Sequence, residues 1–147
     1  ARARVKNGPQ AIGRSKGGLS TKIHATVDAL GNPLGFHLSG GQASDLDGAD
    51  VLLPTLKTAQ LIADKGYDAD ARVIHPWEGV GKYAVIPPRL RRKPGRKWDR
   101  ALYRSRHLIE NFFAKLKQYR AIATRYDKTA TNFLAAIHLA ASVIWLI

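Results

Sequence analysis

Residues 98–119 read WDRALYRSRHLIENFFAKLKQY, and the fold of the chain is best understood from this stretch outward. It contains no Pro or Gly, and Asp99 near its start suits a helix N-terminus. At about 100° per residue, four polar side chains of different chemistry fall within a stripe roughly 60° wide. These side chains are Tyr103, Arg106, Glu110 and Lys117. The sequence therefore predicts one helix over 98–119 that presents a carboxylate flanked by two cations and a phenol.

The opposite side of this predicted helix is apolar and forms a face suited to a hydrophobic core. It is built from Leu102, Leu108, Ile109, Phe112, Phe113 and Leu116. The polar stripe then has two interpretations. It is either a functional surface held up by a buried helix, or a solvated face on which Arg106 and Glu110 form an incidental pair four residues apart.

Composition limits what kind of protein this is. The chain has 147 residues, of which 45% are hydrophobic, so one domain with a real core is expected. The absence of cysteine excludes a disulfide framework and a thiolate zinc site. The first residues lack the apolar stretch of a signal peptide, and the apolar last fifteen are too short to cross a bilayer. We therefore expect no membrane partner, and we expect a buried terminal helix over 131–147.

Charge is segregated along the chain. Its net charge is +13, with +6 over residues 1–22, −5 over 23–81 and +12 over 82–128. Such an excess of positive charge favours a polyanionic partner, most simply nucleic acid. An acidic segment bordered by basic ones fits metal chemistry on a phosphate backbone.

Two basic segments are candidates for phosphate contacts. Residues 1–18 form a basic arm rich in Gly and turn formers, although a flexible terminus is the favoured explanation for them. Residues 89–97, RLRRKPGRK, hold six cations and no acid. We expect this basic loop to grip phosphates through Arg91, Arg92 and Lys93, the alternative being a solvated surface run.

The first half of the chain predicts a hairpin followed by a helix. Residues 19–28 and 34–39 have the pattern of strands, and Gly31-Asn32-Pro33 between them predicts a turn. A helix within 40–57 is expected to be capped by Ser44 or Asp45. His24 and His37 would face each other or solvent, but without a third ligand we do not expect them to bind a metal.

A short apolar run, Leu61 to Ala63, ends sharply at Asp64. The carboxyl end of a buried strand is where α/β sheets place functional groups, so Asp64 is a candidate ligand for a divalent cation. The alternative is that Asp64 only initiates the turn that follows, in which Asp68 is interpreted as a turn residue. Residues 69–77 then predict a helix, and residues 82–87 predict another strand.

Taken in order, these elements predict an α/β fold with a mixed sheet and packed helices. Three stretches also resemble a known family: AIGRSKGGLSTKIHATVDALGNP at 11–33; GQASDLDGADVLL at 41–53 with IADKGYDAD at 62–70; and the spaced Tyr-Arg-Glu-Lys set of the helix. They are similar to the C-terminal part of DDE transposases of bacterial insertion sequences. Catalytic domains in that group have the RNase H-like fold.

The resemblance implies roles for specific residues. Asp64 and Glu110 would be catalytic and, with a first Asp, would hold two Mg²⁺ ions, Mn²⁺ being possible. Tyr103, Arg106 and Lys117 would position phosphates of the transposon end. The implied activity is metal-dependent strand cleavage and strand transfer on transposon ends and target DNA. A homodimer on DNA and a place at the nucleoid in the bacterial cytoplasm are implied as well.

One departure from the family pattern matters. The family's first catalytic Asp lies on the first strand of its fold, whereas no Asp or Glu precedes Asp28 here. We therefore expect that the first strand is missing and that the chain is a truncated, inactive part of a transposase. Two alternatives stay open: a basic nucleic-acid-binding module without chemistry, and an RNase H-like nuclease that hydrolyses but does not transfer strands.

Overall fold

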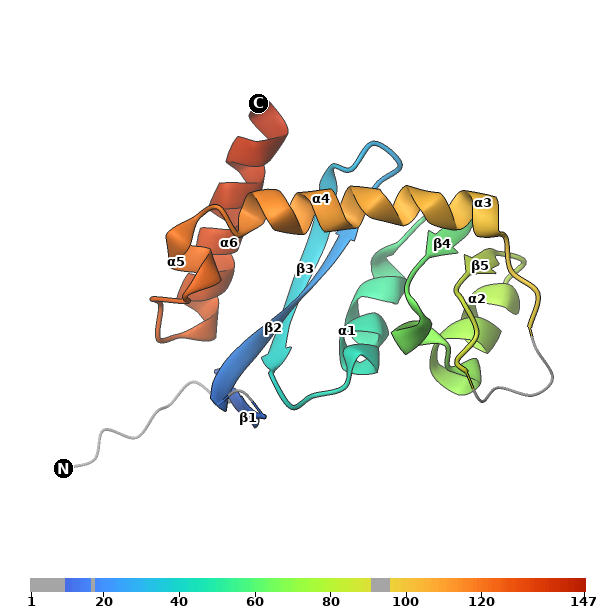
Figure 1. The fold of residues 1–147 in the computed structure, drawn as a ribbon, viewed down its shortest axis with the longest axis horizontal. Coiled ribbons are helices and arrows are strands. Elements are labelled where there is room, and N and C mark those ends of the chain that lie inside the picture. The colour runs from blue at the N-terminus through green and yellow to red at the C-terminus, as the bar shows by residue number, and fades with distance from the viewer. Residues whose placement is uncertain (1–9, 17, 91–95) are drawn as a thin grey trace.

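The computed structural model describes residues 10–16, 18–90 and 96–147. Its strands are β1 (Gly13–Ser15), β2 (Gly18–Val27), β3 (Pro33–Gly40), β4 (Gln60–Ile62) and β5 (Tyr83–Val85). Its α-helices are α1 (Asp45–Leu52), α2 (His75–Glu78), α3 (Arg100–Tyr103), α4 (His107–Leu116), α5 (Arg120–Ala123) and α6 (Ala130–Leu146). The mixed α/β class expected from the sequence is confirmed (Figure 1).

The predicted hairpin is present as β2 and β3, which pair antiparallel with His24 opposite His37. Part of the basic arm forms a strand, whereas the sequence suggested an arm without regular structure. Gly13–Ser15 forms β1 and pairs with the start of β2, because Gly18 adopts a φ of 104° that lets the chain reverse. Residues 1–9 of the arm lie outside the described residues.

The second sheet consists of β4 and β5, which run parallel with Leu61 opposite Ala84. A π-helical turn, Asp70–Ile74, leads into α2 and provides the crossover between them. Among the described residues the five strands therefore form two separate sheets, which corrects the single mixed sheet that was expected. Between the sheets, the edges of β2 and β4 face a groove of about 550 Å³.

The helix predicted over 98–119 is shorter and contains a tighter turn. α3 and α4 are joined through a 3₁₀ turn at Arg104–Arg106, and together they form one rod that crosses over the hairpin (Figure 1). Asp99 caps this rod as expected, accepting a hydrogen bond of 3.0 Å from the backbone N–H of Leu102. α4 ends at Leu116, with Lys117 as its C-cap.

Two hydrophobic clusters hold these elements together. One lies where α4 and α6 pack on the hairpin and contains Phe112, Leu116, Phe133 and Ile137. The other lies between α1, α2 and β5 and contains Ile74, Trp77, Ala84 and Ile86. Four residues of the apolar face predicted for the long helix, Ile109, Phe112, Phe113 and Leu116, pack in the first cluster. The other two, Leu102 and Leu108, line the groove between the sheets.

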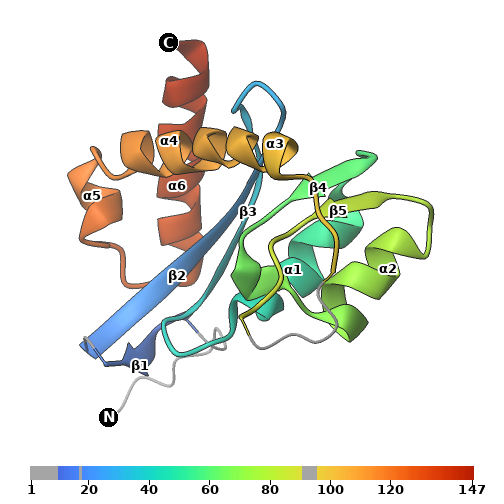
Figure 2. The same ribbon diagram turned by 45° about the vertical axis from the view of Figure 1, so that its right-hand side comes forward.

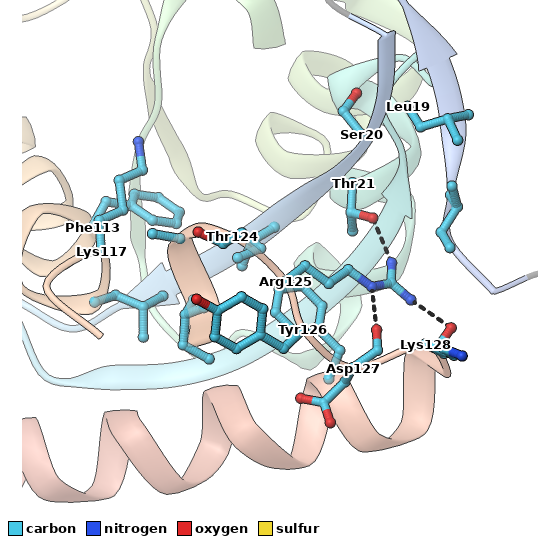
Figure 3. A pocket seen from close by; sticks show the side chains of 16 residues that line it. Leu19, Ser20, Thr21, Phe113, Lys117, Thr124, Arg125, Tyr126, Asp127 and Lys128 are labelled. Atoms are coloured by element: carbon cyan, nitrogen blue, oxygen red, sulfur yellow. Dashed lines mark hydrogen bonds between the residues drawn. The ribbon is translucent and has the colours of Figure 1, made fainter. Parts of the chain in front are cut away.

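α6 begins at Ala130, one residue before the start expected from the sequence, and Thr129 is its N-cap. Beside this cap, the Arg125 guanidinium donates hydrogen bonds to the backbone oxygens of Gln10 (2.8 Å), Ala11 (3.1 Å) and Asp127 (3.0 Å), and another to the Thr21 hydroxyl. Figure 3 shows this side chain reaching across a pocket of about 920 Å³. Arg125 thus ties the N-terminal segment to the start of α6. No helix of the described part of the chain is long and apolar enough to cross a bilayer.

Shortening Ile137 to Ala tests the packing of α6. Ile137 is fully buried, so Ile137→Ala should lower the free energy of unfolding by about 3 kcal/mol. Leu139→Ala on the same helix is the matched control. Leu139 is 69% exposed, so this change should stay within about 0.5 kcal/mol of wild type. Urea unfolding of both variants measures the difference, and equal losses would contradict the placement of α6.

Candidate active site

Asp64 lies just beyond the carboxyl end of β4, as the sequence predicted. Its Oδ1 accepts a hydrogen bond of 2.8 Å from the backbone N–H of Gly66 and so caps the turn Lys65–Tyr67. A Cβ at Gly66 would come within 2.9 Å of this oxygen, so the residue type at 66 allows the close approach. The second oxygen, Oδ2, points away from this turn toward the long helix.

Arg106 joins the two candidate catalytic carboxylates. Its Nη2 lies 3.1 Å from Asp64 Oδ2, and its Nη1 donates to Glu110 Oε1. The side chains of Asp64 and Glu110 are 37% and 59% exposed, so both remain accessible from solvent. Figure 2 shows how this arises, with α3 and the start of α4 passing close to the end of β4. The structure therefore brings Asp64, Arg106 and Glu110 together.

Two tyrosines lie beside this cluster. Burial raises the pKa of Tyr103, and the carboxylates of Asp64 and Glu110 raise it further while Arg106 opposes them. Burial likewise raises the pKa of Tyr67 to about 12, with contributions from Asp45 and Asp64. Both phenols therefore stay neutral at physiological pH and keep a hydroxyl proton to donate. Tyr103 was expected here, whereas Tyr67 was not singled out from the sequence.

Lys117, the last member of the stripe, lies apart from the other three. It follows Glu110 by seven positions, a distance of about 10 Å along the helix axis. It lines the same pocket as Arg125 and Lys128, and Figure 3 shows it beside Phe113. The predicted polar stripe therefore spans two neighbouring regions of the surface, one around Glu110 and one around Lys117.

The centre of the basic loop, with Arg91, Arg92 and Lys93, lies outside the described residues. Both of its ends are held by one carboxylate, that of Asp68. Asp68 Oδ2 accepts a hydrogen bond of 2.8 Å from the backbone N–H of Arg89, and Oδ1 lies 3.3 Å from Arg96 Nη2. The side chains of Asp68 and Arg96 are only 1% and 13% exposed. The interpretation of Asp68 as a turn residue is therefore incomplete, because its carboxylate is a buried anchor.

This anchor connects the basic loop to the turn that bears Asp64. The guanidinium of Arg89 donates to the backbone oxygen of Gly66 at 2.9 Å, and Asp68 follows the same turn. Arg96 stands three residues before Asp99, the cap of α3. One buried ion pair thus fixes both segments that lead to the candidate carboxylates. No sequence signal marked Asp68 or Arg96, since Asp is common in turns and Arg is common in basic loops.

The facing histidines of the hairpin do not form a metal site in the described part of the chain. Their ring centroids are 5.8 Å apart, and His24 Nε2 lies 2.7 Å from the Ser39 hydroxyl. Over residues 10–16, 18–90 and 96–147, no three side chains of His, Cys, Asp or Glu gather as metal ligands. Asp64 and Glu110 offer two hard oxygen ligands of the kind that Mg²⁺ prefers, and Arg106 offers the planar donor set that binds phosphate.

Comparison with known proteins identifies relatives of the chain. The sequence matches the family described as "Transposase DDE domain" over residues 4–145. It is also 42% identical over 132 residues to the "Putative transposase for insertion sequence element IS6501" of Brucella ovis. That alignment covers 87% of this chain and 99% of the relative. No solved structure matches.

Removing the charge of Asp68 tests the buried anchor. Asp68→Asn leaves Arg96 buried without its counter-charge, so the free energy of unfolding should fall by about 3 kcal/mol. Asp47→Asn is the control, because Asp47 pairs with Arg72 at 2.9 Å in a solvated pair. The free energy of unfolding of this variant should stay near that of wild type. Urea unfolding compares the two, and equal stabilities would show that the Asp68 pair contributes nothing.

The buried histidine predicts a pH dependence of stability. Burial lowers the pKa of His24, and the neighbouring His37 lowers it further. The unfolded chain, whose histidine has a pKa near 6.5, therefore binds a proton more readily than the folded chain does. The free energy of unfolding should fall as the pH drops below about 6.5. Urea unfolding at about pH 7.5 and about pH 5.5 should show the loss, and His24→Gln should reduce it.

Proposed function

Since this chain belongs to the transposase DDE domain family, we propose that Asp64 and Glu110 are its catalytic carboxylates, acting in metal-dependent cleavage and strand transfer of insertion-sequence DNA. One observation carries the proposal. These two carboxylates, far apart in sequence, share the guanidinium of Arg106 at the surface. A solvated helix face without a function would not be expected to contact a carboxylate at the end of β4.

The residues fit a hard divalent cation, Mg²⁺ with Mn²⁺ as a substitute. Both ligands are carboxylates with substantial exposure, and Asp64 is fixed by the N–H of Gly66, which leaves its other oxygen directed toward Arg106. When bound, such ions activate a water or a DNA 3′-hydroxyl and stabilise the leaving oxygen. Asp64 and Glu110 would hold the ions, and the turn and helix would fix the direction of each ligand.

The cations and phenols around the carboxylates suit the DNA strand. Arg106 and the neutral Tyr103 offer donors next to Glu110, where a phosphate at the reacting bond would lie. Lys117 and the basic loop with Arg91, Arg92 and Lys93 would grip the backbone farther away. The charge of +12 over residues 82–128 supports this assignment. A homodimer on DNA in the bacterial cytoplasm remains part of the proposal.

The groove between the two sheets supports the RNase H-like part of the proposal. Consecutive residues of β2 and the following turn, 23–29, and of β4 and its end, 60–64, line it. Both strands therefore present their edges rather than one face, which is the arrangement that accepts an additional strand. α1 and the long helix close its two sides through Leu52 and Ile109. Asp64 is among the residues that line this groove.

Neutralising each carboxylate tests the proposal. Asp64→Asn and Glu110→Gln should each weaken Mn²⁺ binding by roughly tenfold or more, because the charge of the ligand set governs affinity. Asp50→Asn, which removes a carboxylate paired with Arg72, should leave it unchanged. Electron paramagnetic resonance of free Mn²⁺ measures the binding. Identical titrations for all four proteins would favour a basic nucleic-acid-binding module instead.

Strand transfer separates the proposed transposase from a nuclease. In Mg²⁺, joining of a labelled DNA with a free 3′-hydroxyl to a target duplex would support the transposase. Products of hydrolysis without joined DNA would support the nuclease.

A further inference from the structure

The Arg106 guanidinium occupies a position that bears on the proposed metal site. It contacts both carboxylates at once, one nitrogen on each, and its side chain is 28% exposed. Asp64 and Glu110 come from different segments, and Arg106 is the side chain that links them among the described residues. Resting on the function proposed above, we infer that Arg106 competes with a divalent cation for these oxygens and passes to a DNA phosphate when the cation binds.

The competition follows from charge and from shared ligands. Asp64 Oδ1 is engaged by the Gly66 N–H, so the oxygen left for a cation is Oδ2, the same atom that Arg106 contacts. A cation held by Asp64 and Glu110 would compete with the guanidinium for the lone pairs of the carboxylates and would repel its positive charge. Arg106 and the cation therefore oppose each other at this site.

A displaced Arg106 has a natural new partner. It lies in the 3₁₀ turn between α3 and α4, where the neighbouring positions Ser105 and His107 are exposed, so its side chain can swing outward without leaving the surface. Its planar donor set binds phosphate oxygens in pairs, and a phosphate beside the cation would be the strongest nearby anion. The guanidinium is thus held by carboxylates when the cation is absent and by DNA when it is present.

This exchange couples the two ligands. A cation that frees Arg106 should raise affinity for DNA, and by linkage DNA should raise affinity for the cation by the same factor. Arg106 would then be a positioning residue with two partners, rather than a group that binds phosphate constitutively. Arg104 provides a matched control, because it lies on the same turn, is exposed, and has no carboxylate partner among the described residues.

The first experiment measures Mn²⁺ binding to the full 147-residue chain by electron paramagnetic resonance. Arg106→Gln should bind Mn²⁺ about three- to tenfold more tightly than wild type, because two partly solvated pairs no longer compete. Arg104→Gln, with the same loss of charge, should change the affinity much less. Equal effects of the two changes, or weaker binding by Arg106→Gln, would overturn the inference. Circular dichroism confirms that each variant is folded.

The second experiment measures binding of a fluorescent 30-base-pair duplex of arbitrary sequence, about three helical turns of DNA, in EDTA and in Ca²⁺. In EDTA, Arg106→Gln should lose no more affinity than Arg104→Gln; in Ca²⁺, it should lose severalfold more. An equal loss in both buffers would mean that Arg106 does not change partners. Failure of the proposed function looks different: Asp64→Asn would then bind Mn²⁺ as wild type does, whatever Arg106→Gln shows.

Discussion

Packing of the long helix on the hairpin and on α6 is the constraint on which the rest of the structure depends. Phe112 and Leu116 are buried on one side of α4, where Phe133 and Ile137 of α6 meet them. A helix fixed along one face cannot rotate, so its polar stripe must point the opposite way. Asp64 follows the end of β4 and meets that stripe through Arg106 of the 3₁₀ turn, whose Nη2 donates to Asp64 Oδ2. The candidate site is thus a consequence of where the core places one helix.

The sequence predicted those parts of the fold that local pattern determines. Alternation gave the hairpin, helical periodicity gave the apolar face of α4, and Asp99 marked the start of the helix. It also placed Asp64 at the end of a strand and Glu110 on an outward face. Each of these inferences needs only neighbours within a few residues, which is the range over which side-chain period and capping act.

Contacts between distant segments were out of reach of the same reasoning. Nothing in the pattern around Asp68 distinguishes a buried anchor for Arg96 from an ordinary turn residue, because the partner lies 28 positions away. The division into two sheets and the separate location of Lys117 likewise depend on how elements pack together. The family match supplied the transposase class that local pattern alone left open.

Arg125 has a backbone φ of 42°, in the left-handed region that suits glycine and strains other residues. Glycine would relieve that strain but would release the backbone oxygens of Gln10 and Ala11, which the guanidinium holds. The chain tolerates a locally unfavourable conformation in order to fasten its first described residues beneath the start of its last helix. If either the N-terminal segment or the start of α6 detaches, the hydrogen bonds that offset the strain at Arg125 are lost. The two segments should therefore unfold together as one cooperative unit.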